Sequence, residues 1–271
     1  MKETGEKMRW AVFADIHGNL EALETALAYT QKHRLSQFMV LGDSVGYGAN
    51  PNECLEWALQ NAGFHVLGNH EAAVIHEKIR EKFSDWAREA IDWTAERLRP
   101  ELIARIKDLP YLQAGGNVTL AHGTLHSPEE FHYLFDENDA WLSLISNRKP
   151  VQSQFTFNWK KKNWDAYKSF LALRTRWGFV GHSHVPSYFA EKEDAGGYLK
   201  EGVLKLRKQE RYLLNPGSIG QPRDRDPRLS FGILDEDELT FEIVRLPYDN
   251  KRASEKILAE GLPASLAYRL L

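Results

Sequence analysis

Cysteine is almost absent from this chain, since Cys54 is the only one among 271 residues. The chain therefore cannot form an internal disulfide, and a structural zinc site held by several thiolates is not expected. So little cysteine also fits a reducing compartment. The sequence contains no run close to the roughly 20 apolar residues that a membrane-spanning helix needs. We therefore expect no membrane span and no membrane partner.

The chain also lacks a strong excess of either charge. Its 35 lysines and arginines nearly balance its 38 aspartates and glutamates, and the formal net charge is −3. There is no overall basic field to attract nucleic acid, although a local basic patch is not excluded by this balance. The first seven residues are rich in charge and have no apolar core behind them, unlike a secretory signal. We expect a cytoplasmic protein.

Nothing in the sequence divides it into separate units. There is no internal repeat and no low-complexity linker, and the proportions of 42% hydrophobic and 27% charged residues are ordinary for a globular protein. A length of 271 residues is at the upper end of what one domain usually reaches. We predict a single domain over residues 1–271.

Short apolar runs alternate with helical patterns in the first third of the chain. Residues 10–14, 38–41 and 64–67 are runs of strand length, and leucines and alanines recur at helical spacing after Asn19. Asn50-Pro51 is typical of a helix start. This β-α-β-α-β order predicts a mainly parallel sheet with right-handed crossovers.

The later part of the chain predicts more strands and helices. Helices are expected at 84–98, at 100–107 and in a tail over 254–271 that is broken at 261–263. Strands are expected at 118–121, 178–180 and 212–214, followed by an antiparallel hairpin of 230–234 and 239–244. The residues alone therefore predict an α/β fold with an antiparallel part late in the chain.

A polar cluster follows five of the predicted strands. Ligands of open parallel sheets lie beyond the carboxyl ends of the strands, so these clusters should converge in space. Their members are Asp15, His17, Asp43, Asn69, His70, His122, His182 and His184.

The residue types in these clusters are those that hold hard and borderline metal ions. Carboxylate oxygen, amide oxygen and neutral imidazole are ligands that Mn²⁺, Fe and Zn²⁺ accept. Two such ions about 3.5–4 Å apart, joined by a carboxylate, can clamp an in-line phosphoryl displacement and activate a bridging water. Any one cluster is compatible with a solvated turn. Their combination and order favour a metal site.

Five motifs in this order resemble one known family. They read "DIHGN", "GDSVGYG", "GNHE", "AHG" and "GHSH". Together they resemble the calcineurin-like metallophosphoesterases, and the resemblance extends from Trp10 to about Leu234. "SVGYGANPNEC", "NPGSIGQPRDRDPRLSFGILD" and the tail are similar to a bacterial and archaeal branch described as phosphodiesterase-like or diadenosine-tetraphosphatase-like. The fold that this resemblance implies is a four-layer sandwich of two mixed β-sheets flanked by helices.

The resemblance also implies a role for each polar residue. Two divalent metal ions are expected, with Mn or Fe favoured over Zn or Ni. His70 would lie off the metals and face the phosphate, as an electrostatic stabiliser or as a general acid. The first metal would be held by Asp15, His17 and His184, the second by Asn69, His122 and His182, and Asp43 would bridge the two.

Several neighbouring residues have more than one interpretation. Asn19 is expected to orient a ligand through a hydrogen bond. Glu71 either orients His70 or begins a helix, where an acidic residue suits the dipole. Arg223 is a candidate for binding substrate phosphate, and Arg225 and Arg228 are weaker ones. The alternative for all three arginines is a loop in which arginines and aspartates satisfy one another.

The segment over about 127–177 interrupts the strand pattern and predicts a cap or insert. Its stretch "QFTFNWKKKNWDAYKSF" mixes Phe155, Phe157, Trp159, Trp164 and Tyr167 with three lysines. Aromatic faces can stack on nucleobases while lysines contact phosphates, which suits a nucleotide-binding cap. An amphipathic patch that covers the core or a subunit contact is the alternative, and we favour it.

The resemblance predicts a dinuclear-metal phosphoester hydrolase with a small phosphoester or nucleotide substrate. We favour a phosphodiesterase or a nucleotide phosphoanhydride hydrolase that uses a metal-bridging hydroxide. The alternatives are a phosphomonoesterase or protein phosphatase and a catalytically silent scaffold. The scaffold is disfavoured because every ligand position is filled. A nucleic-acid partner is disfavoured by the charge balance, although an exonuclease stays open, and the sequence makes no prediction about oligomeric state.

Overall fold

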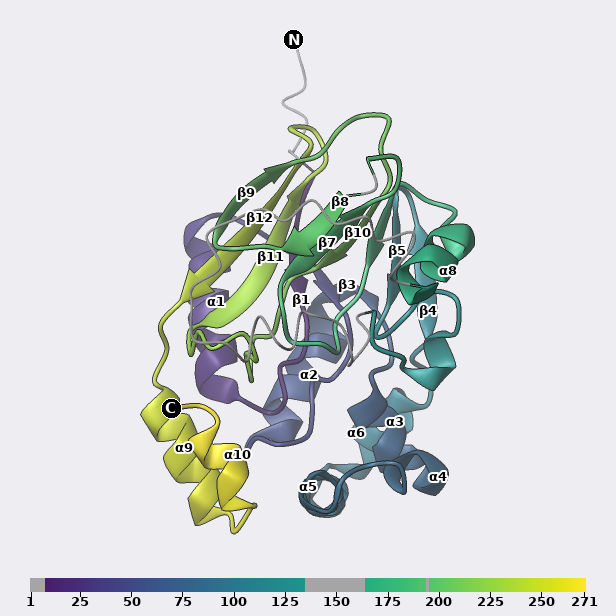
Figure 1. Cartoon of the computed structure of the whole chain (residues 1–271). Helices are drawn as coiled ribbons and strands as arrows, with labels where there is room; N and C mark the ends of the chain where they lie inside the picture. Colours follow the sequence, from purple (N-terminus) through teal and green to yellow (C-terminus); the bar gives the residue numbers. More distant parts are fainter. Residues whose placement is uncertain (1–7, 135–163, 194) are drawn as a thin grey trace.

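Two six-stranded β-sheets lie face to face in the computed structural model, which describes residues 8–134, 164–193 and 195–271 (Figure 1). In spatial order, the first sheet contains β3 (Ala62–His65), β2 (Gln37–Val40), β1 (Arg9–Phe13), β11 (Leu229–Asp235), β12 (Thr240–Leu246) and β9 (Gly202–Lys205). The second contains β4 (Leu112–Gly115), β5 (Val118–Ala121), β6 (Trp177–Phe179), β10 (Tyr212–Asn215), β7 (Ser187–Ala190) and β8 (Ala195–Tyr198).

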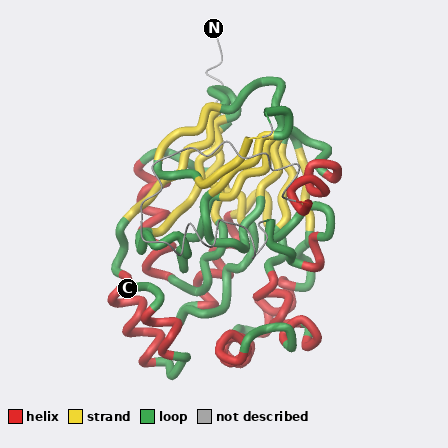
Figure 2. The backbone as a smooth tube through the Cα atoms, in the orientation of Figure 1, coloured by secondary structure: helices red, strands yellow, loops and turns green. Residues whose placement is uncertain are grey.

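Helices lie along the outer sides of the two sheets and beyond one end of them, as Figure 2 shows. They are α1 (Leu20–Lys32), α2 (Pro51–Asn61), α3 (Asn69–Ile75), α4 (Glu77–Arg80), α5 (Asp85–Arg97), α6 (Pro100–Ile106), the 3₁₀ turn η1 (Pro128–Glu130), α8 (Trp164–Ala172), α9 (Asn250–Ala259) and α10 (Ala264–Tyr268). The predicted sandwich of two mixed sheets flanked by helices is confirmed. Within the described part of the chain, no helix has the length and apolar character needed to cross a bilayer.

β1 lies at the centre of the first sheet and is apolar on both faces. Ala11 and Phe13 pack with α1 and α2, whereas Val12 points into the space between the sheets. A strand buried on both sides is expected to be an apolar run rather than an alternating one, as this one is. β1, β2 and β3 pair in parallel, but β11, β12 and β9 pair antiparallel. The predicted parallel arrangement is therefore correct only for the first half of this sheet.

The largest core fills the space between the two sheets. Phe241 from the first sheet meets Phe179 from the second, with ring centroids 5.8 Å apart. Trp177 is fully buried in the same core. Because this core fixes the two sheets to one another, it also fixes the turns at their ends.

The outer face of the second sheet is covered by α8, which lies inside the segment predicted as a cap. Ala166 and Phe170 of α8 and the following Leu173 pack with Val180 and Leu213. This part of the segment therefore contributes to the core. Phe155, Phe157, Trp159 and the three lysines lie outside the described residues, as does the side chain of Trp164. The nucleotide-binding cap and the single domain over 1–271 stay predictions.

Four short strands were not expected from the sequence. β4, β7, β8 and β9 have four residues each, and β8 reads "AGGY". Glycine is depleted in strands because it has no side chain to pack. These strands are stabilised by pairing with partners such as β10 and β12, which depends on the tertiary fold.

Candidate metal centre

The turn after β1 runs beside the turn after β2 and continues the parallel pairing of the two strands. Asp15 donates its backbone N–H to Gly42 O over 3.2 Å, and His17 donates to Asp43 O over 2.9 Å. The turns after β5 and β6 are joined because Gly181 donates its N–H to the backbone oxygen of His122. The turn after β10 lies beside them, since Asn215 Nδ2 donates to Gly181 O, and Gly220 beyond it donates to Asp15 O. The predicted convergence of the polar clusters at one edge is therefore present.

Five of the seven predicted metal ligands have a left-handed backbone. The φ angles are +54° at Asp15, +51° at His17, +55° at Asp43, +65° at His182 and +59° at His184. This region costs a non-glycine residue roughly 1 kcal/mol or more and is concentrated at functional sites. The turns are strained at the positions whose side chains must point to the common centre.

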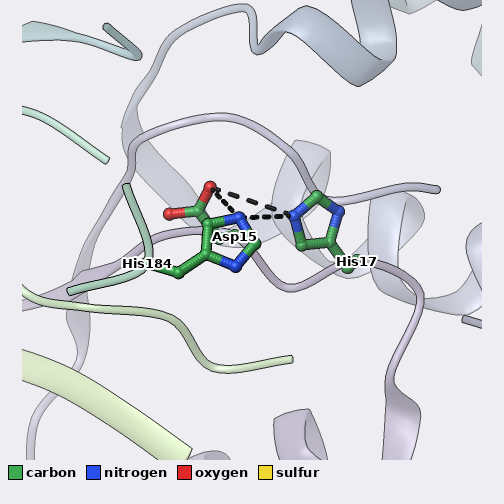
Figure 3. Close-up of side chains that lie close together, drawn as sticks. All are labelled: Asp15, His17 and His184. Carbon is green, nitrogen blue, oxygen red and sulfur yellow. Dashed lines mark hydrogen bonds and ion pairs between the residues drawn. The ribbon is translucent and has the colours of Figure 1, made fainter. Parts of the chain in front are cut away.

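The first predicted ligand group is assembled from both sheets (Figure 3). His17 Nε2 lies 3.0 Å from His184 Nε2, and Asp15 Oδ1 lies 3.3 Å from His184 Nε2. Asp15 and His17 follow β1 of the first sheet, whereas His184 follows β6 of the second. All three side chains are buried. Their ligand atoms lie within 4.8 Å of one another, which one ion can span.

The second predicted group lies directly beside the first. His122 Nε2 lies 2.9 Å from Asn69 Oδ1, 3.1 Å from His182 Nδ1 and 3.2 Å from Asp43 Oδ2. Asn69 and Asp43 come from the first sheet, and the two histidines come from the second. All four residues predicted for the second metal therefore meet around one point.

Asp43 is placed between the two groups, as a bridging residue must be. Its Oδ2 lies 3.7 Å from His17 Nε2 in the first group and 3.2 Å from His122 Nε2 in the second. Its other oxygen accepts the backbone N–H of His70 over 2.9 Å, which fixes the rotation of the carboxylate.

The hydrogen bonds of three histidine rings fit metal ligation. The Nδ1 atoms of His17, His122 and His184 face the backbone oxygens of Val45, Leu41 and Gln221 over 3.0, 2.7 and 2.6 Å. A carbonyl oxygen only accepts, so each Nδ1 carries the proton and each Nε2 of a neutral ring presents a lone pair. Lone pairs of His17 and His184 that face one another over 3.0 Å are stabilised by a cation between them.

The pKa values of the histidines fit a site that is stabilised by a bound cation. Burial lowers the pKa of His17, His182 and His184 well below its ordinary value, which keeps these rings in the neutral, ligating form. Burial also opposes charge on His122, but Asp43 raises the pKa of His122 to about 9. The acceptors around His122 are stabilised by positive charge, which a proton on His122 or a divalent ion at the same place can supply.

Glu71 holds the turn that carries Asp43. Its buried carboxylate accepts the backbone N–H groups of Asp43, Ser44, Val45 and Gly68. Burial, followed by the charge of Asp43, raises the pKa of Glu71 to about 7. Neither sequence interpretation of Glu71 included its contact with Asp43, which is 28 residues away in the chain. Glu71 does begin α3, but its carboxylate fixes the Asp43 turn rather than the ring of His70.

His70 is buried against the aromatic rings of Tyr47 and Phe83. Its Nε2 is 3.9 Å from Asp43 Oδ2, and its ring packs edge-on against Tyr47 and Phe83 with centroids 4.3 and 5.0 Å apart. Its Nδ1 is buried with no hydrogen-bond partner in the described part of the chain, and it faces Gly46, where an added Cβ would come within 2.1 Å of it. Sequence reasoning missed Tyr47, although it lies within "GDSVGYG".

The residues near the centre differ in what they contact. Asn19 Nδ2 donates to Gly220 O over 2.9 Å, and Gly220 in turn donates to Asp15 O, so Asn19 fixes a turn beside a predicted ligand. Arg228 is paired with Asp226 and Glu201 over 2.7 and 2.8 Å, as the alternative interpretation expected.

Comparison with known proteins bears directly on this arrangement. A family model described as calcineurin-like phosphoesterase matches residues 8–186, which carry all seven predicted ligands. The chain belongs to the calcineurin-like phosphoesterase family. An uncharacterized protein of Methanocaldococcus jannaschii is 36% identical to it over 264 residues, which cover 96% of each chain.

Solved structures agree with this membership. The phosphoesterase chain is similar to the crystal structure of a metallophosphoesterase from Sphaerobacter thermophilus, with 32% identity, a TM-score of 0.76 and 98% of both chains covered. A hypothetical protein from Pyrococcus horikoshii OT3 shares the fold, with 18% identity, a TM-score of 0.69 and 97% of both chains covered. As a member of this family the chain is a phosphoric ester hydrolase, and the family depends on two metal ions.

Replacing Glu71 by glutamine should release the Asp43 turn. The amide NH₂ would face two backbone N–H groups that the carboxylate now accepts, and each unsatisfied buried donor costs about 1–3 kcal/mol. We expect the free energy of unfolding in urea to fall by about 3 kcal/mol and the Mn²⁺ content to fall with it. Glu77→Gln, at an exposed position of α4, is the matched control. A Glu71→Gln protein as stable as the control would contradict this role.

Proposed function

We propose that this phosphoesterase cleaves phosphodiesters or nucleotide phosphoanhydrides at a centre of two divalent metal ions. The main support is the convergence of Asp15, His17 and His184 beside Asn69, His122 and His182, with Asp43 between the two groups. The donor set contains oxygen and imidazole nitrogen and no sulfur, which suits Mn²⁺ or Fe and also admits Zn²⁺ or Ni²⁺. When bound, two such ions polarise the phosphoryl group and supply a nucleophilic hydroxide near neutral pH.

The protein contributes position and a controlled charge balance. Backbone N–H groups of His70 and His182 donate to the carboxylates of Asp43 and Asp15, so neither carboxylate can turn away from the centre. His70 Nε2 lies 3.9 Å from Asp43 Oδ2, and we assign the ring to stabilise a phosphate oxygen or to protonate the leaving group. Arg223 lines the adjoining cavity and offers a guanidinium to the phosphate.

The first test is a hydrolysis panel on metal-stripped protein with and without added Mn²⁺. The substrates are bis-p-nitrophenyl phosphate, p-nitrophenyl phosphate and diadenosine tetraphosphate. We expect metal-dependent cleavage of the diester or the dinucleotide at a kcat/KM well above that of the monoester. Preference for the monoester would move the assignment to a phosphomonoesterase. Failure to cleave all three despite two bound ions per chain would favour the catalytically silent scaffold.

Asp43→Asn should remove the bridge between the two ions. The amide retains the volume but loses the charge that both ions share, so we expect turnover to be abolished and the metal content measured by elemental analysis to fall from two ions per chain. Asp108→Asn, an exposed substitution after α6, should retain both. The bridging role would be refuted by an Asp43→Asn protein that is active and fully metallated.

His70→Ala should separate catalysis from metal binding. Loss of a residue that stabilises the phosphate or protonates the leaving oxygen typically lowers kcat by about 10²- to 10⁴-fold. We expect a fall in kcat of this size on bis-p-nitrophenyl phosphate while two ions per chain stay bound. Loss of an ion in the variant would instead make His70 a ligand, which its distance from Asp43 permits.

A further inference from the structure

A cavity of about 750 Å³ adjoins the candidate metal centre and extends away from it. Asn69 and His182 form its boundary with the centre. Its lining also contains Phe83 and Trp86 from the α5 region and Arg269 from the end of α10. Arg269 lies beyond residues 8–186, which the family model matches. The cavity is therefore larger than a scissile phosphate requires, and part of its wall belongs to the C-terminal segment.

Three arginines line this cavity without a carboxylate partner among the described residues. They are Arg223, Arg225 and Arg269. Arg223 Nη2 donates to Gln221 Oε1 over 3.3 Å, while its buried Nε has no hydrogen-bond partner in the same part of the structure. The other charged residues of the lining are Lys82, Glu129 and Glu130, and Glu130 pairs with Lys82 over 3.7 Å. Positive charge on the cavity wall therefore exceeds negative charge.

Arg269 is held over the cavity by an aromatic platform. Its guanidinium carbon lies 4.5 Å from the ring centroid of Trp86 on α5. The helices α9 and α10 that carry it pack against α5 and Tyr47 through Leu266 and Ala267. Stacking on an aromatic face leaves the N–H groups at the edge of a guanidinium free to donate, so Arg269 is pre-oriented for an anion.

Arg223 is fixed by a buried ion pair immediately beside it. Asp224 pairs with Arg245 of β12, and its Oδ2 also accepts the hydroxyl of Tyr198 over 2.6 Å. Both members of the ion pair have almost fully buried side chains. Arg223 also donates its backbone N–H to His184 O over 3.3 Å, so its position is tied to that of a predicted ligand.

Arg223 and Arg269 are close enough to influence one another. Burial, followed by the charge of Arg223, lowers the pKa of Arg269. Two like charges that face one cavity, neither of them paired with a carboxylate of the described residues, repel one another, and a polyanion between them removes this cost. The chain thus places one guanidinium beside the backbone of His184 and a second on Trp86, both in the lining of the same cavity.

We propose that Arg269 binds a second phosphate of the substrate, beyond the phosphate that Arg223 contacts and whose ester or anhydride bond is cleaved. This inference rests on the proposed function and narrows its substrate class to phosphoesters that carry at least two phosphates, such as nucleoside diphosphates and longer polyphosphates. Arg269 is then a specificity residue rather than part of the metal centre.

The test is competition between nucleotides that differ by one phosphate. Hydrolysis of bis-p-nitrophenyl phosphate by the Mn²⁺-loaded enzyme is measured with AMP or ADP as inhibitor at fixed free Mn²⁺. The quantity compared is the ratio of the two inhibition constants within each variant, which cancels general effects on the site. We expect wild-type enzyme to bind ADP about tenfold or more tighter than AMP, because a hydrogen bond to a charged group is worth about this factor.

Arg269→Gln should bring this ratio close to one, and Arg269→Lys should restore part of it because lysine retains the charge. Arg252→Gln is the control, since Arg252 is an exposed arginine of α9 that pairs with Glu21 and should leave the ratio unchanged. A wild-type ratio near one, or an unchanged ratio in Arg269→Gln, overturns the inference. If wild-type enzyme does not hydrolyse the diester, the proposed function fails separately. Equilibrium dialysis of AMP and ADP against the Mn²⁺-loaded variants then measures the same ratio.

Discussion

The structure depends on holding carboxylate oxygens and imidazole nitrogens close together in a buried site. Ligand atoms of Asp15, His17 and His184 lie within one ion's reach, and so do those of Asp43, His122 and His182. Such atoms repel one another unless positive charge lies among them. The left-handed turns, the Glu71 carboxylate under the Asp43 turn and the backbone oxygens that orient each imidazole all serve to keep these acceptors from relaxing apart.

The predicted metal ligands could be identified from the sequence because each lies in a short motif at the end of a strand. Asp15 and His17 follow an apolar run and precede a glycine, so both the strand end and the residue type are visible in the sequence. The five-motif order then supplied the fold, which the structure and the family match confirm. The parallel half of the first sheet follows from the same alternation of strands and helices, and the predicted antiparallel hairpin is present as β11 and β12. The pairing of this hairpin with β1 joins strands that are nearly the whole chain apart and could not be predicted.

Other features depend on contacts that no local pattern encodes. Arg223 and Arg228 belong to one loop and look alike in sequence, but among the described residues only Arg228 pairs with carboxylates. Three of the four hydrogen bonds of Glu71 go to the turn of Asp43, Ser44 and Val45, 26 to 28 residues earlier in the chain. Arg269 likewise contacts a tryptophan on a helix far from it in sequence. The strand β8 has too much glycine to be recognised without its partner.

Each predicted ligand group takes side chains from both sheets, and this has a consequence for the stability of the whole sandwich. An ion bound by Asp15, His17 and His184 joins the first sheet to the second at their common edge, as does an ion bound by Asp43, Asn69, His122 and His182. A ligand that binds only the folded state adds its binding free energy to folding. With the proposed ions bound, the stability of the contact between the two sheets would depend partly on the concentration of free metal, and the same ions would link the two halves of the fold.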